Sequence, residues 1–112
     1  MRVMLFFDLP TLTSSNKKAY RVFVKNLKRD GFYMLQESVY VKMALNKQIA
    51  EATINKLKKN LPSEGDIMTL VITEKQFASI SILLGKNHTD VVNNVDRIVT
   101  LWLNYLLNQL IN

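Results

Sequence analysis

The order in which the hydrophobic spacing changes along this chain constrains its fold more than any other feature. Short apolar or alternating runs, typical of strands, occur at Arg2–Leu9, Phe32–Leu35, Ser38–Met43 and Asp66–Thr73. Amphipathic helices are expected over Ser15–Asp30 and from Asn46 to about Asn60. The order strand, helix, strand, strand, helix, strand predicts a ferredoxin-like α+β fold, an antiparallel sheet with helices on one face.

Two further segments follow this βαββαβ core. Ser79–Leu84 alternates briefly and is expected to form a fifth strand, and Asp90–Ile111 carries an apolar stripe expected to form a last helix. We therefore expect a ferredoxin-like domain with its fifth strand over residues 1–85 and a C-terminal helical extension over residues 86–112. Because an exposed sheet edge favours pairing with another chain, a homodimer is expected.

Local signals mark where these elements begin and end. Pro10 cannot continue a strand ladder, and Thr13–Ser15 supplies good caps for the first helix. Gly31 is well placed to end that helix. Gln36-Glu37 separates the second and third runs, either as a very tight connection or as a bulge in one bent strand.

The residue content excludes several kinds of chemistry. The chain has no cysteine and one histidine, His88, which excludes disulfides, thiolate catalysis and cysteine zinc sites. No P-loop or G-x-G-x-x-G run supports a nucleotide cofactor. Val3–Phe7 is too short for a signal peptide, and no stretch approaches the roughly 20 apolar residues of a membrane span. A cytoplasmic protein without membrane contact is therefore expected.

Positive charge is concentrated on the first predicted helix. The net charge of +6 favours a polyanionic partner. On a helix, a set of cations falls within a sector of about 120°, which we call the basic face. Its members are Lys17, Lys18, Arg21, Lys25, Lys28 and Arg29. An ordinary solvated face usually mixes both signs, whereas such a row follows the phosphates of a duplex, so nucleic-acid binding is expected here.

Asp8 is the sharpest candidate for chemistry, because it directly follows the apolar run Val3–Phe7. A carboxylate at a strand end is a hard ligand suited to Mg²⁺, or to Mn²⁺. One carboxylate is a weak site, but two copies across a dimer axis, with substrate phosphates, would form a plausible one. Alternatively, Asp8 only hydrogen-bonds the turn that follows it. Other acidic residues could add to the site but are more typical of turns or the surface: Glu37, Glu64 and Asp66.

Taken together, these residues resemble the CRISPR-associated protein 2 family, most closely the branch found with type II systems. The matching residues are Phe6-Phe7-Asp8-Leu9-Pro10, the basic helix, and Gly31-Phe32-Tyr33-Met34-Leu35-Gln36-Glu37-Ser38-Val39-Tyr40. The resemblance covers roughly residues 1 to 85. It implies a ferredoxin-like homodimer whose fifth strand packs on the partner's sheet, with Asp8 and its symmetry mate as Mg²⁺ ligands. In one departure, Phe7 stands where the family often has tyrosine.

The resemblance also implies two activities. Family members have been assigned metal-dependent endonuclease activity on RNA or double-stranded DNA. In spacer acquisition, the dimer bridges two dimers of a partner integrase and holds the captured DNA, and the catalysis then belongs to the integrase. Three hypotheses follow: a CRISPR adaptation subunit with metal-assisted nuclease activity, a catalytically inactive DNA-holding scaffold with the same partners, and a ferredoxin-like nucleic-acid-binding module or toxin-type ribonuclease outside CRISPR.

Overall fold

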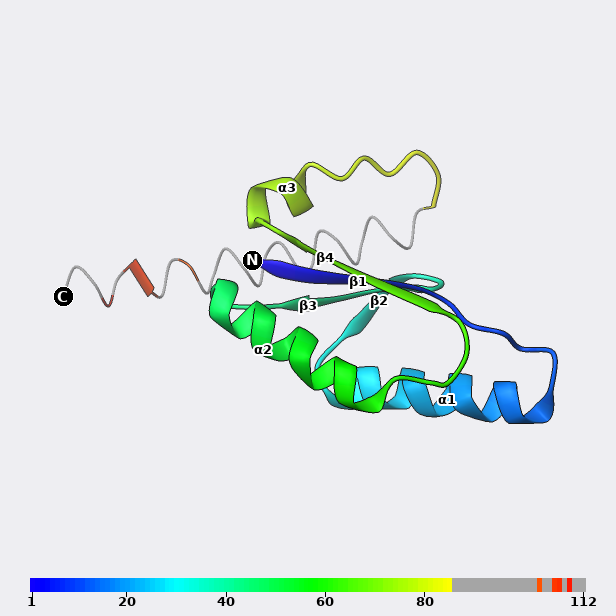
Figure 1. Ribbon diagram of the computed structural model, residues 1–112. Coiled ribbons are helices and arrows are strands. Elements are labelled where there is room, and N and C mark those ends of the chain that lie inside the picture. Colours follow the sequence, from blue (N-terminus) through cyan, green and yellow to red (C-terminus); the bar gives the residue numbers. More distant parts are fainter. Residues whose placement is uncertain (86–102, 104–105, 108, 110–112) are drawn as a thin grey trace. The chain divides into compact units, whose positions relative to one another are not determined.

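The computed structural model describes residues 1–85, 103, 106–107 and 109. By its internal contacts the chain divides into two compact units, Met1–Phe77 and Ala78–Asn112. The first unit contains the sheet and both long helices (Figure 1). Within the described part of the chain, no helix is long and apolar enough to cross a membrane.

The first unit has the predicted order of elements. They are β1 (Arg2–Asp8), α1 (Ser14–Arg29), β2 (Tyr33–Gln36), β3 (Val39–Met43), α2 (Lys47–Leu57), the 3₁₀-helix η1 (Lys58–Asn60) and β4 (Asp66–Ile72). The strands form a 4-stranded sheet in the order β2-β3-β1-β4, and every neighbouring pair is antiparallel. Figure 1 shows α1 and α2 together on one side of this sheet. The ferredoxin-like prediction is confirmed.

The core lies between the sheet and these two helices. Val3, Leu5 and Phe7 of β1 are buried in one cluster with Phe23 and Leu27 of α1. The rings of Phe7 and Phe23 meet edge to face, with their centroids 5.5 Å apart. Because side chains alternate across a strand, the even-numbered residues of β1, ending in Asp8, point to the opposite face of the sheet.

Both ends of α1 follow the local signals in the sequence. Thr13 is the N-cap, and its side chain accepts a hydrogen bond from the backbone N–H of Asn16 at 3.0 Å. At the other end, Gly31 adopts a φ of +95°. The backbone N–H of Phe32 then donates to the carbonyl of Leu27 at 2.9 Å, which is the main bond of a Schellman motif.

The connection between β2 and β3 is the tight one of the two alternatives left open above, because two separate strands form rather than one bent strand. Glu37 and Ser38 form a tight turn between the two strands. The β2–β3 register also shifts between Met34 and Gln36, as a β-bulge does.

The prediction of a fifth strand over Ser79–Leu84 is wrong for the chain by itself. In the structure this segment consists of turn, bend and irregular backbone. A brief alternation determines which side chains share a face, but a strand also needs a neighbour for its backbone hydrogen bonds. The described sheet ends at β4.

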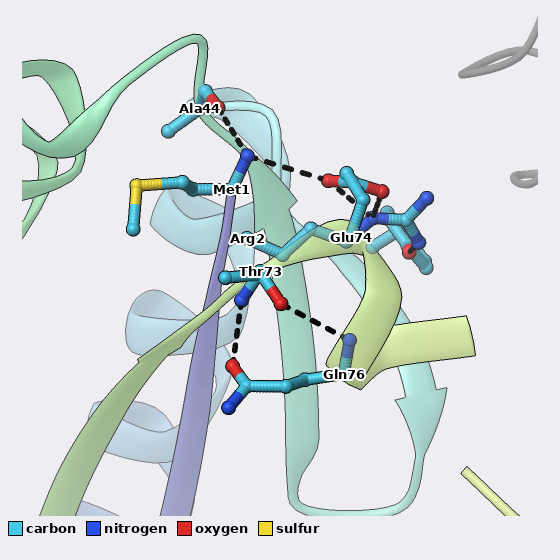
Figure 2. Close-up of polar contacts among 7 residues, drawn as sticks. Met1, Arg2, Ala44, Thr73, Glu74 and Gln76 are labelled. Atoms are coloured by element: carbon cyan, nitrogen blue, oxygen red, sulfur yellow. Dashed lines mark hydrogen bonds and ion pairs between the residues drawn. The ribbon is translucent and has the colours of Figure 1, made fainter. Parts of the chain in front are cut away.

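A short helix, α3 (Glu74–Ala78), follows β4 and was not indicated by hydrophobic periodicity. It begins with a capping box (Figure 2). Thr73 donates its backbone N–H to Oε1 of Gln76 at 2.9 Å, and Gln76 donates its own to Oγ1 of Thr73 at 3.1 Å. The Thr-x-x-Gln spacing in the sequence is the signal that would have predicted this helix.

Most of the last helix predicted over Asp90–Ile111 lies outside the described residues. Of that range, Leu103, Leu106, Leu107 and Gln109 are described, and all are helical. The domain boundary expected after residue 85 stays a prediction.

Candidate functional site

Asp8 is the last residue of β1, and it is exposed. The β1–β4 register places Asp66, the first residue of β4, directly opposite Asp8. Directly opposed residues point to the same face of a sheet, with Cβ atoms about 5 Å apart. Asp66 is also exposed, so a single chain brings two carboxylates together at this end of the sheet. From the sequence, Asp66 was among the acidic residues that could add to the site but was more typical of a turn or the surface.

Gly65 explains how β4 starts so close to the end of β1. Its φ is +108°, a conformation that residues with a Cβ rarely adopt. A Cβ at this position would lie 2.6 Å from Cδ2 of Leu9 and 2.8 Å from the carbonyl oxygen of Asp8. The absent side chain therefore lets the two backbones approach and positions Asp66 opposite Asp8.

The turn at Ser38 contacts the other side of β1. Phe7 donates its backbone N–H to the carbonyl of Ser38 at 3.1 Å, one residue before Asp8. Ser38 has a φ of +66°, and among the described residues it is the one non-glycine with a positive φ. Holding a serine in this conformation costs on the order of 1 kcal/mol. We call Asp8, Asp66, Gly65 and this turn the Asp8 end of the sheet.

The donor atoms at the Asp8 end suit a hard divalent cation. Carboxylate oxygens are preferred ligands of Mg²⁺ and Mn²⁺. Within the described ranges, no group of three or more His, Cys, Asp or Glu side chains could hold a metal ion. Mg²⁺ commonly keeps several waters and binds one or two carboxylates together with substrate phosphates. Asp8 and Asp66 fit that kind of site.

The basic face of α1 is exposed along its whole length, as expected. Every one of its cations is exposed: Lys17, Lys18, Arg21, Lys25, Lys28 and Arg29. No acidic residue occurs within Ser14–Arg29. Among the described residues, one ion pair involves this face: Nε of Arg29 lies 3.5 Å from Oδ1 of Asp30. The remaining cations are available to a polyanion.

Asp30 ties the end of α1 to α2. Its Oδ1 lies 3.2 Å from Nζ of Lys56 as well as 3.5 Å from Nε of Arg29. Burial opposes ionisation of Asp30, but the neighbouring ammonium of Lys56, helped by Arg29, outweighs it and lowers the pKa of Asp30. Asp30 thus stays ionised and holds the two helices together, a structural role.

Tyr40, the last residue of the motif quoted above, also has a structural role. It is buried in the core, where its ring centroid lies 5.7 Å from that of Phe7. Burial raises the pKa of Tyr40, and the nearby Tyr20 adds to the effect. The phenol therefore stays protonated at neutral pH.

At the opposite end of β1, Arg2 forms a cluster that the sequence did not indicate (Figure 2). Its side chain is 0% exposed. Nε donates to both carboxylate oxygens of Glu74, at 2.8 and 3.1 Å, and Nη1 donates to the hydroxyl of Tyr33 at 3.3 Å. The guanidinium also stacks 3.7 Å from the ring centroid of Phe77. The signal in the sequence that could have predicted this cluster is Arg2 itself, a cation at the start of an otherwise apolar strand.

The family model described as CRISPR associated protein Cas2 matches residues 1–80. The chain belongs to the Cas2 family. Proteins named CRISPR-associated endoribonuclease Cas2 from Ligilactobacillus salivarius (strain UCC118) and Treponema denticola are 46% and 43% identical to it over 101 residues. These matches cover 90% of this chain and 100% of each relative. The resemblance to the Cas2 family inferred from the sequence is confirmed.

A solved structure of Cas2 supports the fold independently. The crystal structure of Streptococcus pyogenes Cas2 at pH 6.5 aligns with a TM-score of 0.57 and 19% sequence identity, covering 75% of this chain and 100% of that one. Membership of the Cas2 family favours the two CRISPR hypotheses over a module outside CRISPR. The roles of Asp8 and of the basic face stay predictions.

Proposed function

We propose that this Cas2-family chain is a CRISPR adaptation subunit, a homodimer that holds duplex DNA along α1 and bridges dimers of a partner integrase. We also propose a Mg²⁺-dependent endonuclease site at Asp8, acting on RNA or on double-stranded DNA. The observation that carries the proposal is the basic face: a row of exposed cations that, but for Arg29, make no ion pair among the described residues.

The length of the basic face suits a duplex. From Lys17 to Lys28 it spans about 16 Å of helix at 1.5 Å per residue. Double-stranded DNA carries one charge per 1.7 Å or so of axis with both strands counted, so on the order of ten phosphates lie within this length and the row follows those on the near side. Contacts of this kind position a duplex without reading its sequence, which suits a subunit that must hold many different DNA fragments.

The proposed hydrolysis depends on carboxylates held on rigid backbone. When bound, Mg²⁺ supplies a Lewis acid for a phosphoryl oxygen and neutralises charge that develops during phosphodiester cleavage. Asp8 would be its ligand, with Asp66 beside it on the same face of the sheet. Gly65 keeps these two strand ends together, so the carboxylates need little reorganisation to receive the ion.

A homodimer is supported by exposed apolar side chains on β4, an edge strand of the sheet. Met68 and Leu70 are 67% and 53% exposed, on the same face as Asp8. Exposed apolar patches at an open sheet edge are typical of protein–protein contacts. A second copy on this face would bring the two Asp8 positions into one assembly, and light scattering of the purified chain tests this part of the proposal.

The inactive scaffold is the second candidate. It is favoured by the absence, within the described residues, of any group of three or more potential metal ligands. A scaffold needs the basic face and the dimer but not the carboxylates.

Two variants separate holding from cleavage. We expect Asp8→Asn to reduce Mg²⁺-dependent cleavage about 100-fold, because the ligand charge is lost, and to leave duplex affinity within about twofold. The double variant Arg21→Gln/Lys25→Gln should instead weaken duplex binding and spare cleavage. It should lower the slope of log affinity against log salt by about 2. Cleavage of labelled RNA and DNA, and fluorescence anisotropy with duplex DNA, measure both quantities.

Matched controls exist for each variant. Glu51→Gln removes an exposed carboxylate on α2, and Lys58→Gln/Lys59→Gln removes two exposed cations on η1. Neither control should change cleavage or the salt slope. Cleavage that survives Asp8→Asn would contradict the nuclease site, and duplex binding unchanged by Arg21→Gln/Lys25→Gln would contradict DNA holding by α1. Tight duplex binding without any cleavage in the wild type would leave the scaffold.

A further inference from the structure

An open hollow of about 370 Å³ lies on the flank of α1. It is lined by Tyr20, Arg21, Val24, Lys25 and Lys28. Residues three or four apart on a helix are neighbours, so Tyr20, Val24 and Lys28 form one row along the hollow. Arg21 and Lys25 form the adjacent row, further from the core.

The lining changes character across the hollow. Tyr20 and Val24 are partly buried and pack against the hydrophobic core, whereas Arg21, Lys25 and Lys28 are exposed. The ring of Tyr20 is held edge to face by Phe7 at a centroid distance of 5.8 Å, so this part of the wall is fixed. The hollow therefore has an apolar side against the core and a cationic side toward solvent.

This combination is more than phosphate contact requires. Phosphates are satisfied by the cations alone, and they would lose hydration against Tyr20 and Val24. A ligand that fits must carry a flat apolar body next to an anion, because it would bury the body on the apolar side and pair the anion on the other. An unpaired nucleobase with its adjoining phosphate has this chemistry, and aromatic side chains commonly contact bases in single-strand binding sites.

The size of the hollow is compatible with a nucleobase. Sites for small molecules hold about 300 to 1,000 Å³, so this hollow lies near the lower end of that range. A nucleobase fits within it. In a duplex the bases are stacked and paired, so only an unpaired nucleotide can present its base to α1.

We propose that the hollow on α1 binds one unpaired nucleobase, with the adjoining phosphates on Arg21, Lys25 and Lys28. The basic face then holds duplex DNA through phosphates and anchors single-stranded nucleic acid, or a frayed end, through this base site. The inference rests on the proposed binding of nucleic acid by α1 and adds a site at which that binding depends on a base.

The test compares two short oligonucleotides that have the same phosphates. One is an ordinary single strand of about eight nucleotides and the other is its abasic counterpart, both measured by fluorescence anisotropy at fixed salt. The wild type should bind the strand with bases about tenfold more tightly, the size of effect that one base contact commonly has. Because the charges are equal, the ratio of the two affinities isolates the base.

Two variants on the same helix locate the effect. Val24→Glu places a carboxylate in the hollow and should reduce the ratio to about 1. Val22→Glu adds the same charge to α1 at a residue that is 48% exposed and outside the hollow, and it should preserve the ratio. Circular dichroism checks folding, and Val24→Gln replaces Val24→Glu if the charged variant unfolds.

Every outcome decides for or against the base site. Equal affinity of the wild type for both strands overturns it without any variant, and so does an equal loss of the ratio in Val22→Glu and Val24→Glu. If the base effect is absent while duplex binding keeps its dependence on Arg21 and Lys25, the base site fails and the proposed function stands. If neither single strands nor duplexes bind, both fail.

Discussion

At the start of β1 the guanidinium of Arg2 is fully buried and bonded to Glu74, whereas at its end Asp8 is exposed and faces Asp66. Both residues occupy even positions of the strand and point to the same face of the sheet. Figure 2 shows how closely the first of these ends is surrounded, with the ammonium of Met1 donating to the carbonyl of Ala44 at 3.0 Å.

The two ends of β1 use charge differently: at one end the charge stabilises the fold, and at the other it is exposed to ligands. A buried charge must be paired and hydrogen-bonded, so Arg2 is committed to Glu74 and to the ring of Phe77. At the Asp8 end the charges are alike and solvated, which costs little and leaves them free for a cation. One strand thus carries a stabilising buried ion pair at one end and the candidate metal ligands at the other.

Breaking the anchored end should have the largest effect on stability. Glu74→Ala leaves Arg2 buried without its carboxylate and should lower the free energy of unfolding by about 3 kcal/mol. For a domain of this size the melting temperature falls by roughly 12 to 24 °C. Asp8→Ala is the control and should change stability by less than about 0.5 kcal/mol. Equal melting temperatures for the two variants would refute the contrast between the ends.

Gly65→Ala tests how the Asp8 end is held together, with a smaller loss of about 2 kcal/mol from backbone strain and crowding. Its new Cβ would meet the backbone of Asp8 and Leu9. Urea unfolding measures the loss, and cleavage should fall as well, because the strand ends separate.

Gly31→Ala is the matched control for Gly65→Ala. Gly31 also has a positive φ, +95°, but a Cβ there would meet only the flexible side chain of Lys42, at 3.4 Å. The loss should be nearer 1 kcal/mol, and cleavage should not change. If Gly31→Ala costs as much as Gly65→Ala, close packing against Asp8 is not what Gly65 provides.

The smallest expected effect is a gain. Asp66→Asn removes one of two opposed like charges and should raise stability by about 0.5 kcal/mol without Mg²⁺. Added Mg²⁺ should then stabilise the variant less than the wild type, because a ligand is missing. Thermal unfolding with and without Mg²⁺ measures both, and Glu64→Gln, at an exposed neighbouring position, should show neither change. An unchanged response to Mg²⁺ in Asp66→Asn would remove Asp66 from the metal site.

Local sequence patterns sufficed for the order of the elements from β1 to β4, the caps at Thr13 and Gly31, the exposed basic face and the exposed strand-end position of Asp8. Each of these depends on residues within a few positions of one another, through helical or strand periodicity. The fifth strand over residues 79–84 was predicted in the same way and does not form in the chain by itself, because pairing is not a local property.

Only the tertiary structure decided which distant residues meet. Arg2 and Glu74 are separated by 72 positions, and the pairing of Asp8 with Asp66 depends on the register between β1 and β4. Register follows from packing the whole sheet on its helices, which no single segment encodes. The sequence by itself therefore determined the elements and the charged face of α1, whereas packing decided which charge became an anchor and which stayed available.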